Sequence, residues 1–342
     1  DFDAQYQTSV GRRHKVSVGG EVRSVDATFT GTFAITVTPP QVEAGADSLF
    51  VQDIFRLTDR LHLIGGLKVE YDHRIGWNEQ PTLRGIWDAG RQHVWAAVSR
   101  AVRTPSLLDT GQRLNIAAVP TAGLPLLVAA FGNPDYQPER LLLTEAGYRL
   151  EAGSTLVVDA TVFHGSYDGL STNEPLPPTF EATPAPAHIL VATELANLLQ
   201  ATTTGVEVAG HWTPHHAWRF DGSYSALRIT PHPYAESHDP AAVQFDGNAP
   251  AHQWQLHSST FVAPHVEVNT GLYYTGRLRD LNTDAYLRAD ARVEWRINKT
   301  LSLIGVGQNL LTPLHAEFTD PQSPVLPTLV PRSGRIDLKW AR

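Results

Sequence analysis

Histidine is the residue type in this sequence with the widest range of chemistry, and the chain has 15 histidines and no cysteine. The lack of cysteine excludes disulfide bonds and thiolate metal sites. His215 and His216 are adjacent in a predicted turn, where neighbouring side chains rarely converge on one metal ion. We therefore interpret both as solvated turn residues and predict neither a metal site nor a bound cofactor.

Two further histidines lie in a segment that connects two predicted strands. His232 stands between Pro231 and Pro233, whose fixed φ angles stiffen that part of the segment. We expect His232, Tyr234 and His238 to contact a ligand from an exposed loop. The alternative is that they are ordinary polar residues of that loop.

Arginines and acids alternate in another candidate site, which we call the arginine ladder. It consists of Arg288, Asp290, Arg292, Glu294 and Arg296. One interpretation is a lining that binds an anionic ligand, mainly through Arg288 and Arg292. The alternative is a charged wall that faces water, in which the opposite charges neutralise one another.

Enzymatic chemistry is not predicted. The carboxylates placed to act as a general acid or base have arginines or threonines nearby, which neutralise them; they are Glu145, Asp159, Asp290 and Glu294. The sequence has no G-x-S-x-G, no H-E-x-x-H and no phosphate-binding loop. We expect no catalytic residue.

Long β-strands must position these residues, and the clearest is the stretch from Ala285 to Ile297. Its odd positions are apolar and its even positions are nearly all charged, which is the period of a strand with one apolar and one ionic face. A typical globular strand has about 5–6 residues, whereas a tilted strand that crosses a membrane needs about 9–11. This stretch favours the second kind, and the same long pattern recurs along the chain.

Composition narrows the class of protein. The 342 residues are 42% hydrophobic and 18% charged, with a formal net charge of −8. No apolar run reaches 18 residues, so a helical membrane protein is excluded. A transmembrane β-barrel stays possible, because every second residue of its strands is polar. The acidic balance argues against nucleic acid as a partner.

Short and long connections alternate between the predicted strands. The short turns lie near residues 58–60, 88–91, 151–154, 213–216 and 298–299, and the long connections cover 29–46, 103–139, 167–186, 230–249 and 311–331. Bacterial outer-membrane barrels have short periplasmic turns and longer extracellular loops. We expect the long connections to carry ligand choice.

Tryptophans give an independent indication. Six of the 8 lie near the short turns or the C-terminus, as an aromatic girdle at one membrane interface requires; they are Trp87, Trp95, Trp212, Trp218, Trp295 and Trp340. The alternative is a set of scattered core tryptophans.

We count about fifteen strands and predict an all-β, antiparallel transmembrane β-barrel. An odd number leaves the barrel open, and unpaired edge amides are not tolerated in lipid. The simplest resolution is that residues 1–342 are the C-terminal portion of a larger barrel, which does not seal alone. The alternatives are a passive pore that closes as a smaller barrel and a soluble β-rich binding protein.

Several stretches resemble the barrel of TonB-dependent outer-membrane receptors. They occur in that family's order and span nearly the whole chain: "WAAVSRAVRTPS" (Trp95–Ser106), "GNPDYQPERLLLTEAGYR" (Gly132–Arg149), "TTTGVEVAGHW" (Thr202–Trp212), "VGQNLLTPLHAEF" (Val306–Phe318) and "VPRSGRIDLKW" (Val330–Trp340). The resemblance implies a Gram-negative outer-membrane transporter with a 22-stranded, plugged barrel. It implies outer-membrane lipid, the TonB complex and a scarce ligand, typically a ferric siderophore, as partners.

Two departures from that family's pattern are present. The plug domain and the TonB-contacting segment are not in this chain, so the TonB complex would act through a missing N-terminal region. Ala341 and Arg342 follow Trp340, where such barrels usually end on an aromatic residue.

A haem receptor of the family would carry a histidine within residues 101–140, which contain none, so haem is disfavoured as the ligand.

Overall fold

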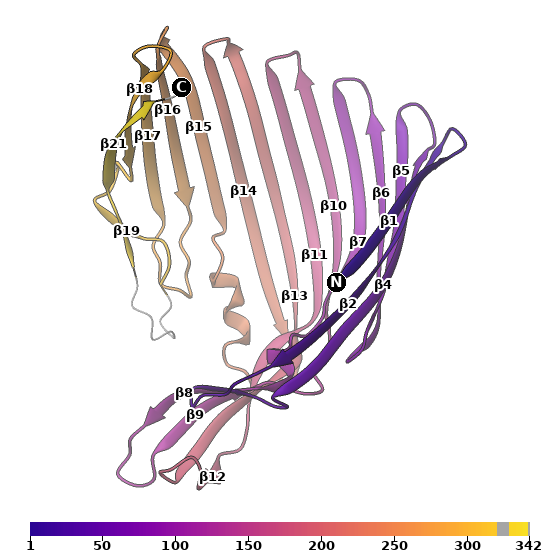
Figure 1. Ribbon diagram of the computed structural model, residues 1–342, viewed down its shortest axis with the longest axis vertical. Helices are drawn as coiled ribbons and strands as arrows, with labels where there is room; N and C mark the ends of the chain where they lie inside the picture. The colour runs from indigo at the N-terminus through magenta and orange to yellow at the C-terminus, as the bar shows by residue number, and fades with distance from the viewer. Residues whose placement is uncertain (320–327, 341–342) are drawn as a thin grey trace.

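The computed structural model describes residues 1–319 and 328–340 of a nearly all-β chain (Figure 1). The expectations for residues 320–327 of the last long connection, and for Ala341 and Arg342, lie outside this range. In residues 1–319 and 328–340, helix is confined to α1 (Leu107–Gly111) and the 3-10 helix η1 (Ala242–Gly247). Within the described ranges, no helix has the length and apolarity to cross a membrane.

The main sheet has 19 strands, of which four short ones stand apart from the membrane wall. The other fifteen form the wall: β1 (Phe2–Val10), β2 (His14–Thr28), β4 (Gln41–Arg56), β5 (Leu61–Asp72), β6 (Gly76–Asp88), β7 (Gln92–Arg103), β10 (Glu139–Ala152), β11 (Leu156–Pro175), β13 (His188–His215), β14 (Trp218–Pro233), β15 (His252–Ala263), β16 (Val266–Thr275), β17 (Tyr286–Arg296), β18 (Leu301–Gln308) and β21 (Ser333–Trp340).

Each wall strand pairs antiparallel with the wall strand that follows it in the chain, as in a meander. The predicted number of strands and their antiparallel order are therefore confirmed. The wall curves like part of a barrel (Figure 1). Among the described residues β1 pairs only with β2, and β21 only with β18, so the sheet is open.

Alternation gives the wall two chemically different faces. Val208 of β13 lies opposite Tyr224 of β14, and these side chains are 37% and 39% exposed on the outer face. The next pair, Glu207 and Ser225, lies on the inner face. A slip of one residue would exchange the two faces, so the apolar outer face fixes the register.

The two ends of the wall differ as the connections predict. Short turns lie at the top of Figure 1, and a small extension projects from the opposite end. The extension contains β3 (Ile35–Val37), β8 (Gln112–Val119), β9 (Leu126–Phe131), β12 (Thr179–Glu181) and the first part of β13. Here β9 runs parallel to β13, unlike the wall strands.

The extension corrects our expectation for three of the long connections. Residues 29–46, 103–139 and 167–186 were expected to be loops, but they supply β3, α1, β8, β9, β12 and the end of β11. A small core explains why this segment is ordered: Leu127, Ala129, Leu190 and Ala192 are buried, and Phe131 and Leu176 pack against them. Burial of these side chains between β9 and β13 stabilises the short strands of the extension. Their apolar runs are too short to have predicted these strands from the sequence.

The tryptophan girdle is confirmed for five of the six residues. The indoles near the short turns or the C-terminus that are about half exposed or more are Trp87, Trp212, Trp218, Trp295 and Trp340. Trp95 is different. Its neighbours Val94 and Val98 face outward, so Trp95 faces inward, where the Arg84 guanidinium lies 4.6 Å from its ring centroid.

The two faces predict losses of stability of different size when a charge is placed at neighbouring positions of β11. Val162→Arg places a guanidinium on the outer face, where the Val162 side chain is 54% exposed, and is expected to destabilise the full receptor in bilayers by about 2 kcal/mol. Thr161→Arg, on the inner face, is the matched control and is expected to cost less than about 1 kcal/mol. Urea titration of heat-modifiable migration measures both; equal losses would contradict the assignment of faces.

Candidate functional site

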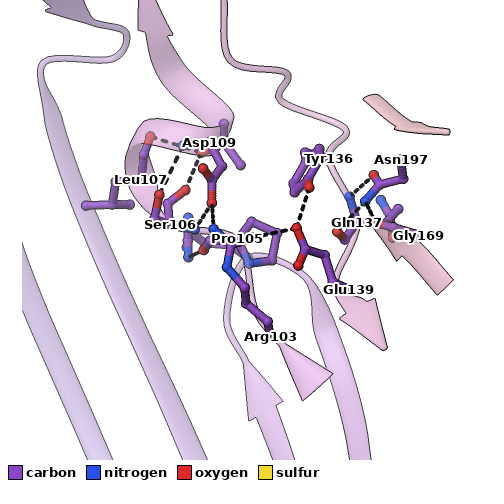
Figure 2. Close-up of polar contacts among 12 residues, drawn as sticks. Arg103, Pro105, Ser106, Leu107, Asp109, Tyr136, Gln137, Glu139, Gly169 and Asn197 are labelled. Atoms are coloured by element: carbon purple, nitrogen blue, oxygen red, sulfur yellow. Dashed lines mark hydrogen bonds and ion pairs between the residues drawn. The ribbon is translucent and has the colours of Figure 1, made fainter. Parts of the chain in front are cut away.

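Five polar residues meet where the wall joins the extension, and we call them the rim cluster: Arg103, Ser106, Asp109, Tyr136 and Glu139 (Figure 2). Arg103, the last residue of β7, donates from Nη1 to Glu139 Oε1 at 2.9 Å and from Nη2 to Asp109 Oδ2 at 2.9 Å. One guanidinium therefore holds the first residue of β10 and helix α1 together. The cluster lies at the end of the wall with long connections, which is the extracellular end of such barrels.

Helix α1 is short, and its start is fixed by a capping box. The Ser106 hydroxyl accepts from Asp109 N–H at 3.1 Å, while the Asp109 carboxylate accepts from Ser106 N–H at 2.9 Å. Gly132 is required beside this helix because a Cβ there would lie 2.7 Å from the carbonyl oxygens of Leu108 and Asp109. The chain can therefore fold back directly over α1.

Tyr136 is the buried centre of the rim cluster. Its side chain is 2% exposed, and its hydroxyl donates to Glu139 Oε1 at 2.8 Å. Burial, together with the hydrogen bond to the Glu139 carboxylate, raises the pKa of Tyr136 well above its ordinary value. The phenol therefore stays a hydrogen-bond donor at physiological pH.

Asn197 of β13 fixes the same segment from the other side (Figure 2). Its Nδ2 donates to the carbonyl oxygens of Gln137 at 2.9 Å and Gly169 at 2.6 Å, and its Oδ1 accepts from Gln137 N–H at 2.8 Å. The charged groups of the rim cluster already have protein partners. We therefore assign it an anchoring role for the extension.

The extension has an ion cluster of its own. Arg113 of β8 donates to both carboxylate oxygens of Glu181, at 3.0 and 2.7 Å, and the buried His188 ring lies 3.1 Å from the same carboxylate. The hydrogen bond from Arg113 lowers the pKa of Glu181, and this effect outweighs its partial burial. The cluster ties β8, β12 and β13 together.

The arginine ladder lies on the inner face of β17, as predicted. Its arginines have carboxylate partners: Arg288 with Asp290 at 3.4 Å and Glu317 at 3.5 Å, Arg292 with Glu294 at 2.5 Å, and Arg296 with Glu267 at 3.0 Å. The Arg288 guanidinium also stacks 4.3 Å from the Tyr273 ring centroid. The ladder is a charge-balanced wall, which agrees with the second interpretation of its sequence.

The five residues predicted to bind a ligand do not come together. Arg288 and Arg292 face the lumen, but His232 lies at the end of β14 opposite Gln200, on the outer face. Tyr234 follows the end of β14, and its hydroxyl donates to Asp168 Oδ1 at 2.6 Å. His238 lies against Glu174, whose carboxylate accepts from the His238 N–H at 2.6 Å. The expectation that His232 belongs to a loop was wrong, because pairing with β13 extends β14 through both prolines.

Of the two histidines predicted in a turn, His215 is the last residue of β13 and pairs with Trp218, and His216 lies in the turn before β14. The ring centroids of His215 and His216 are 3.9 Å apart. Among the described residues, no three or more His, Asp or Glu side chains are grouped to hold a metal ion.

Sequence reasoning missed the rim cluster. Four of its residues lie inside "RTPS" and "NPDYQPER", which belong to stretches that carry the family resemblance, and Asp109 follows the first of them, but Arg103 and Glu139 are 36 residues apart. The available signal was the arginine that begins the first short motif and the second acid of the other motif. Only the pairing of β7 with β10 joins them.

The fold and its two faces define a transmembrane β-barrel wall of a Gram-negative outer membrane, with an extracellular extension. The family model described as "TonB dependent receptor-like, beta-barrel" matches residues 1–310. The chain belongs to this family, whose members are receptors and transporters and not enzymes.

One curated relative and several solved structures are similar to the chain. The iron-regulated outer membrane virulence protein of Vibrio cholerae is 24% identical over 197 residues, which cover 52% of this chain and 28% of that protein. The siderophore receptor PirA from Acinetobacter baumannii superposes with a TM-score of 0.73 at 14% identity, over 99% of this chain and 53% of that one.

The ferric enterobactin receptor PfeA from Pseudomonas aeruginosa, solved as a variant in complex with enterobactin, has a TM-score of 0.73 at 15% identity, over 99% of this chain and 53% of that one. These likenesses show the fold. The chain spans about half the length of the solved receptors that it matches.

Removal of one hydroxyl tests the rim cluster. Tyr136→Phe keeps the buried ring but deletes the donor to Glu139, and is expected to lower the free energy of local opening by about 1–2 kcal/mol. Hydrogen exchange of the amides of residues 133–137 in the full receptor measures the loss. Tyr6→Phe, on an exposed ring of β1, is the control and should change nothing there. Unchanged exchange in Tyr136→Phe would contradict the anchoring role.

The Glu181 cluster predicts an acid-sensitive extension. Because the folded pKa of Glu181 lies below its unfolded value of about 4.3, the ionised carboxylate contributes stability above that value, and the contribution is lost as pH falls through the lowered folded pKa. Limited proteolysis of the extension is therefore expected to accelerate below about pH 4. In Glu181→Gln this part of the pH dependence should disappear; an identical acid profile would contradict the prediction.

Proposed function

We propose that this chain is the C-terminal part of the barrel of an outer-membrane receptor that imports a ferric siderophore with energy from the TonB complex. The observation that carries the proposal is the unbroken series of fifteen wall strands within a chain that matches the family model over residues 1–310. Iron is the cargo that the similar proteins indicate: two are siderophore receptors and the curated relative is iron-regulated.

The open edges of the sheet support a larger barrel. The outer edges of β1 and β21 have no strand partner among the described residues, and unpaired backbone groups in hydrocarbon cost several kcal/mol each. Further strands of the same receptor would satisfy both edges. A 22-stranded barrel with a plugged lumen fits this requirement.

The lumen wall supports a filled barrel better than a free aqueous channel. The ladder arginines are neutralised by carboxylates of the wall itself, so this face does not present a free cationic lining to small anions. Such a surface is suited to packing against a folded plug. Within it, we propose Arg288 and Arg292 as the lumen groups that an anionic ligand meets during passage.

Uptake of radioactive iron tests the proposal. The full receptor is expressed in a strain that lacks its own siderophore receptors, and iron is supplied as ferric enterobactin or as other ferric siderophores. We expect uptake that stops when an uncoupler collapses the proton-motive force. Deletion of the β8–β9 hairpin, residues 112–131, is expected to lower uptake at least tenfold if the extension contacts ligand.

A passive pore predicts a different result. Liposomes containing the receptor would then swell in small sugars without any energy source, and the uncoupler would leave iron uptake unchanged. That pair of results would overturn the proposed import function.

A further inference from the structure

A band of polar and cationic side chains crosses the outer face of the wall at its extracellular end. We call it the outer-rim band and define it by Arg100 (β7), Arg140 (β10), His164 (β11), Arg228 and His232 (both β14). We infer that this band binds the phosphate groups of the glycolipid in the outer leaflet of the outer membrane. The inference is independent of which ligand the receptor imports.

Strand register places these residues on the lipid-facing side. Arg100 lies opposite Leu142, whose side chain is 52% exposed on the outer face. Arg228 lies opposite Thr204, and Thr204 lies opposite His164, two residues along β11 from the outward-facing Val162. Because side chains alternate between faces, the band belongs to the same surface as the apolar belt.

The band begins where the apolar belt ends. On β13 the outer face reads Trp212, Gly210, Val208 and Val206 from the short-turn end, and continues as Thr204, Thr202 and Gln200 toward the extension. A change from apolar to hydroxyl and amide side chains along one strand marks the passage from hydrocarbon to headgroups. The cations of the band stand at this level.

Arg100 forms an ion pair with Glu79 at 3.6 Å, whereas the other two arginines of the band have no ion-pair partner among the described residues. Arg140 and Arg228 are exposed, and neither has a hydrogen bond or an ion pair with another described residue. Asp168 lies opposite Arg140 in register and attracts its charge without forming an ion pair, because its Oδ1 already accepts from Tyr234 at 2.6 Å and from Gln200 at 3.0 Å. An unpaired guanidinium beside hydrocarbon is unfavourable, and a headgroup phosphate removes that cost.

The surface is also hollowed at the band. One depression of about 330 Å³ is lined by Arg100, Arg140, Ser166, Thr202 and His232, among others. The neighbouring depression is lined by Thr204, Arg228, Thr230 and Arg279, among others. Guanidinium and hydroxyl donors together are the groups that bind phosphate oxygens.

The position of the outer-rim band beside the apolar belt favours binding of a phosphate that belongs to a lipid over binding of a soluble phosphate. Leu142 and Val98 lie within the band, in register with Arg100 and His164, and Ala146 and Val162 follow on the outer face toward the short turns, so a molecule whose phosphates reach the arginines would lay its acyl chains along these residues. An outer-leaflet glycolipid carries both parts.

Binding of lipid A to the receptor in nanodiscs tests the inference. The probes are bisphosphorylated lipid A and lipid A stripped of its phosphates, and the variant is Arg140→Gln/Arg228→Gln. At roughly fivefold per arginine, the double variant is expected to bind the phosphorylated probe about twenty-five-fold more weakly. Arg140→Lys/Arg228→Lys should retain most of the binding, and Arg91→Gln, in a turn at the opposite end of the wall, should retain all of it.

The outcomes separate the possible sources of phosphate. The stripped probe should bind unchanged protein as weakly as the phosphorylated probe binds the double variant, and millimolar inorganic phosphate should not compete. Equal binding of both probes to unchanged protein would overturn the inference, even if the double variant failed to fold. Full competition by inorganic phosphate would overturn it as well, because the site would then be one for a soluble anion.

Discussion

Backbone hydrogen bonding in a medium without water is the constraint on which the whole structure depends. Amides and carbonyls in hydrocarbon must find partners within the protein, and the strand ladder from β1 to β21 is accordingly continuous. The irregular pairings fall near strand ends or in the extension: near His215, Ala263, Leu170 and Ala117. Irregular backbone is thus kept where water or other protein groups satisfy it.

The alternation of side chains between the two faces of the wall also determines where its ion pairs form. Charged side chains two residues apart share a face, and several ion pairs of the inner face are of this kind: Lys68 with Glu70, Arg149 with Glu151, Arg219 with Asp221 and Arg292 with Glu294. A strand can therefore balance its own charge before it meets any neighbour. The lumen is polar without a large excess of either sign at these positions.

The placement of apolar residues at every second position was enough to predict the wall, because each long strand repeats this pattern. It was not enough where two apolar residues are adjacent, as at Val94 and Trp95, so the inward orientation of Trp95 could not be read from the sequence. The sequence placed His232 in the connection 230–249, because its pairing with Gln200 of β13 is a long-range contact that no local pattern shows. The rim cluster escaped for the same reason: its partners are local to different motifs, and only the sheet brings them together.

Strand β13 is one uninterrupted element of 28 residues, His188 to His215, and at about 3.3 Å per residue it is roughly 90 Å long. It runs from a periplasmic turn, through the membrane, into the extracellular extension. The extension is therefore joined to the wall by a continuous strand and not by a flexible loop. The register of β11 with β13 shifts near Leu170 and Leu199, and because such an irregularity bends a strand locally, the direction in which the extension projects from the wall is set there.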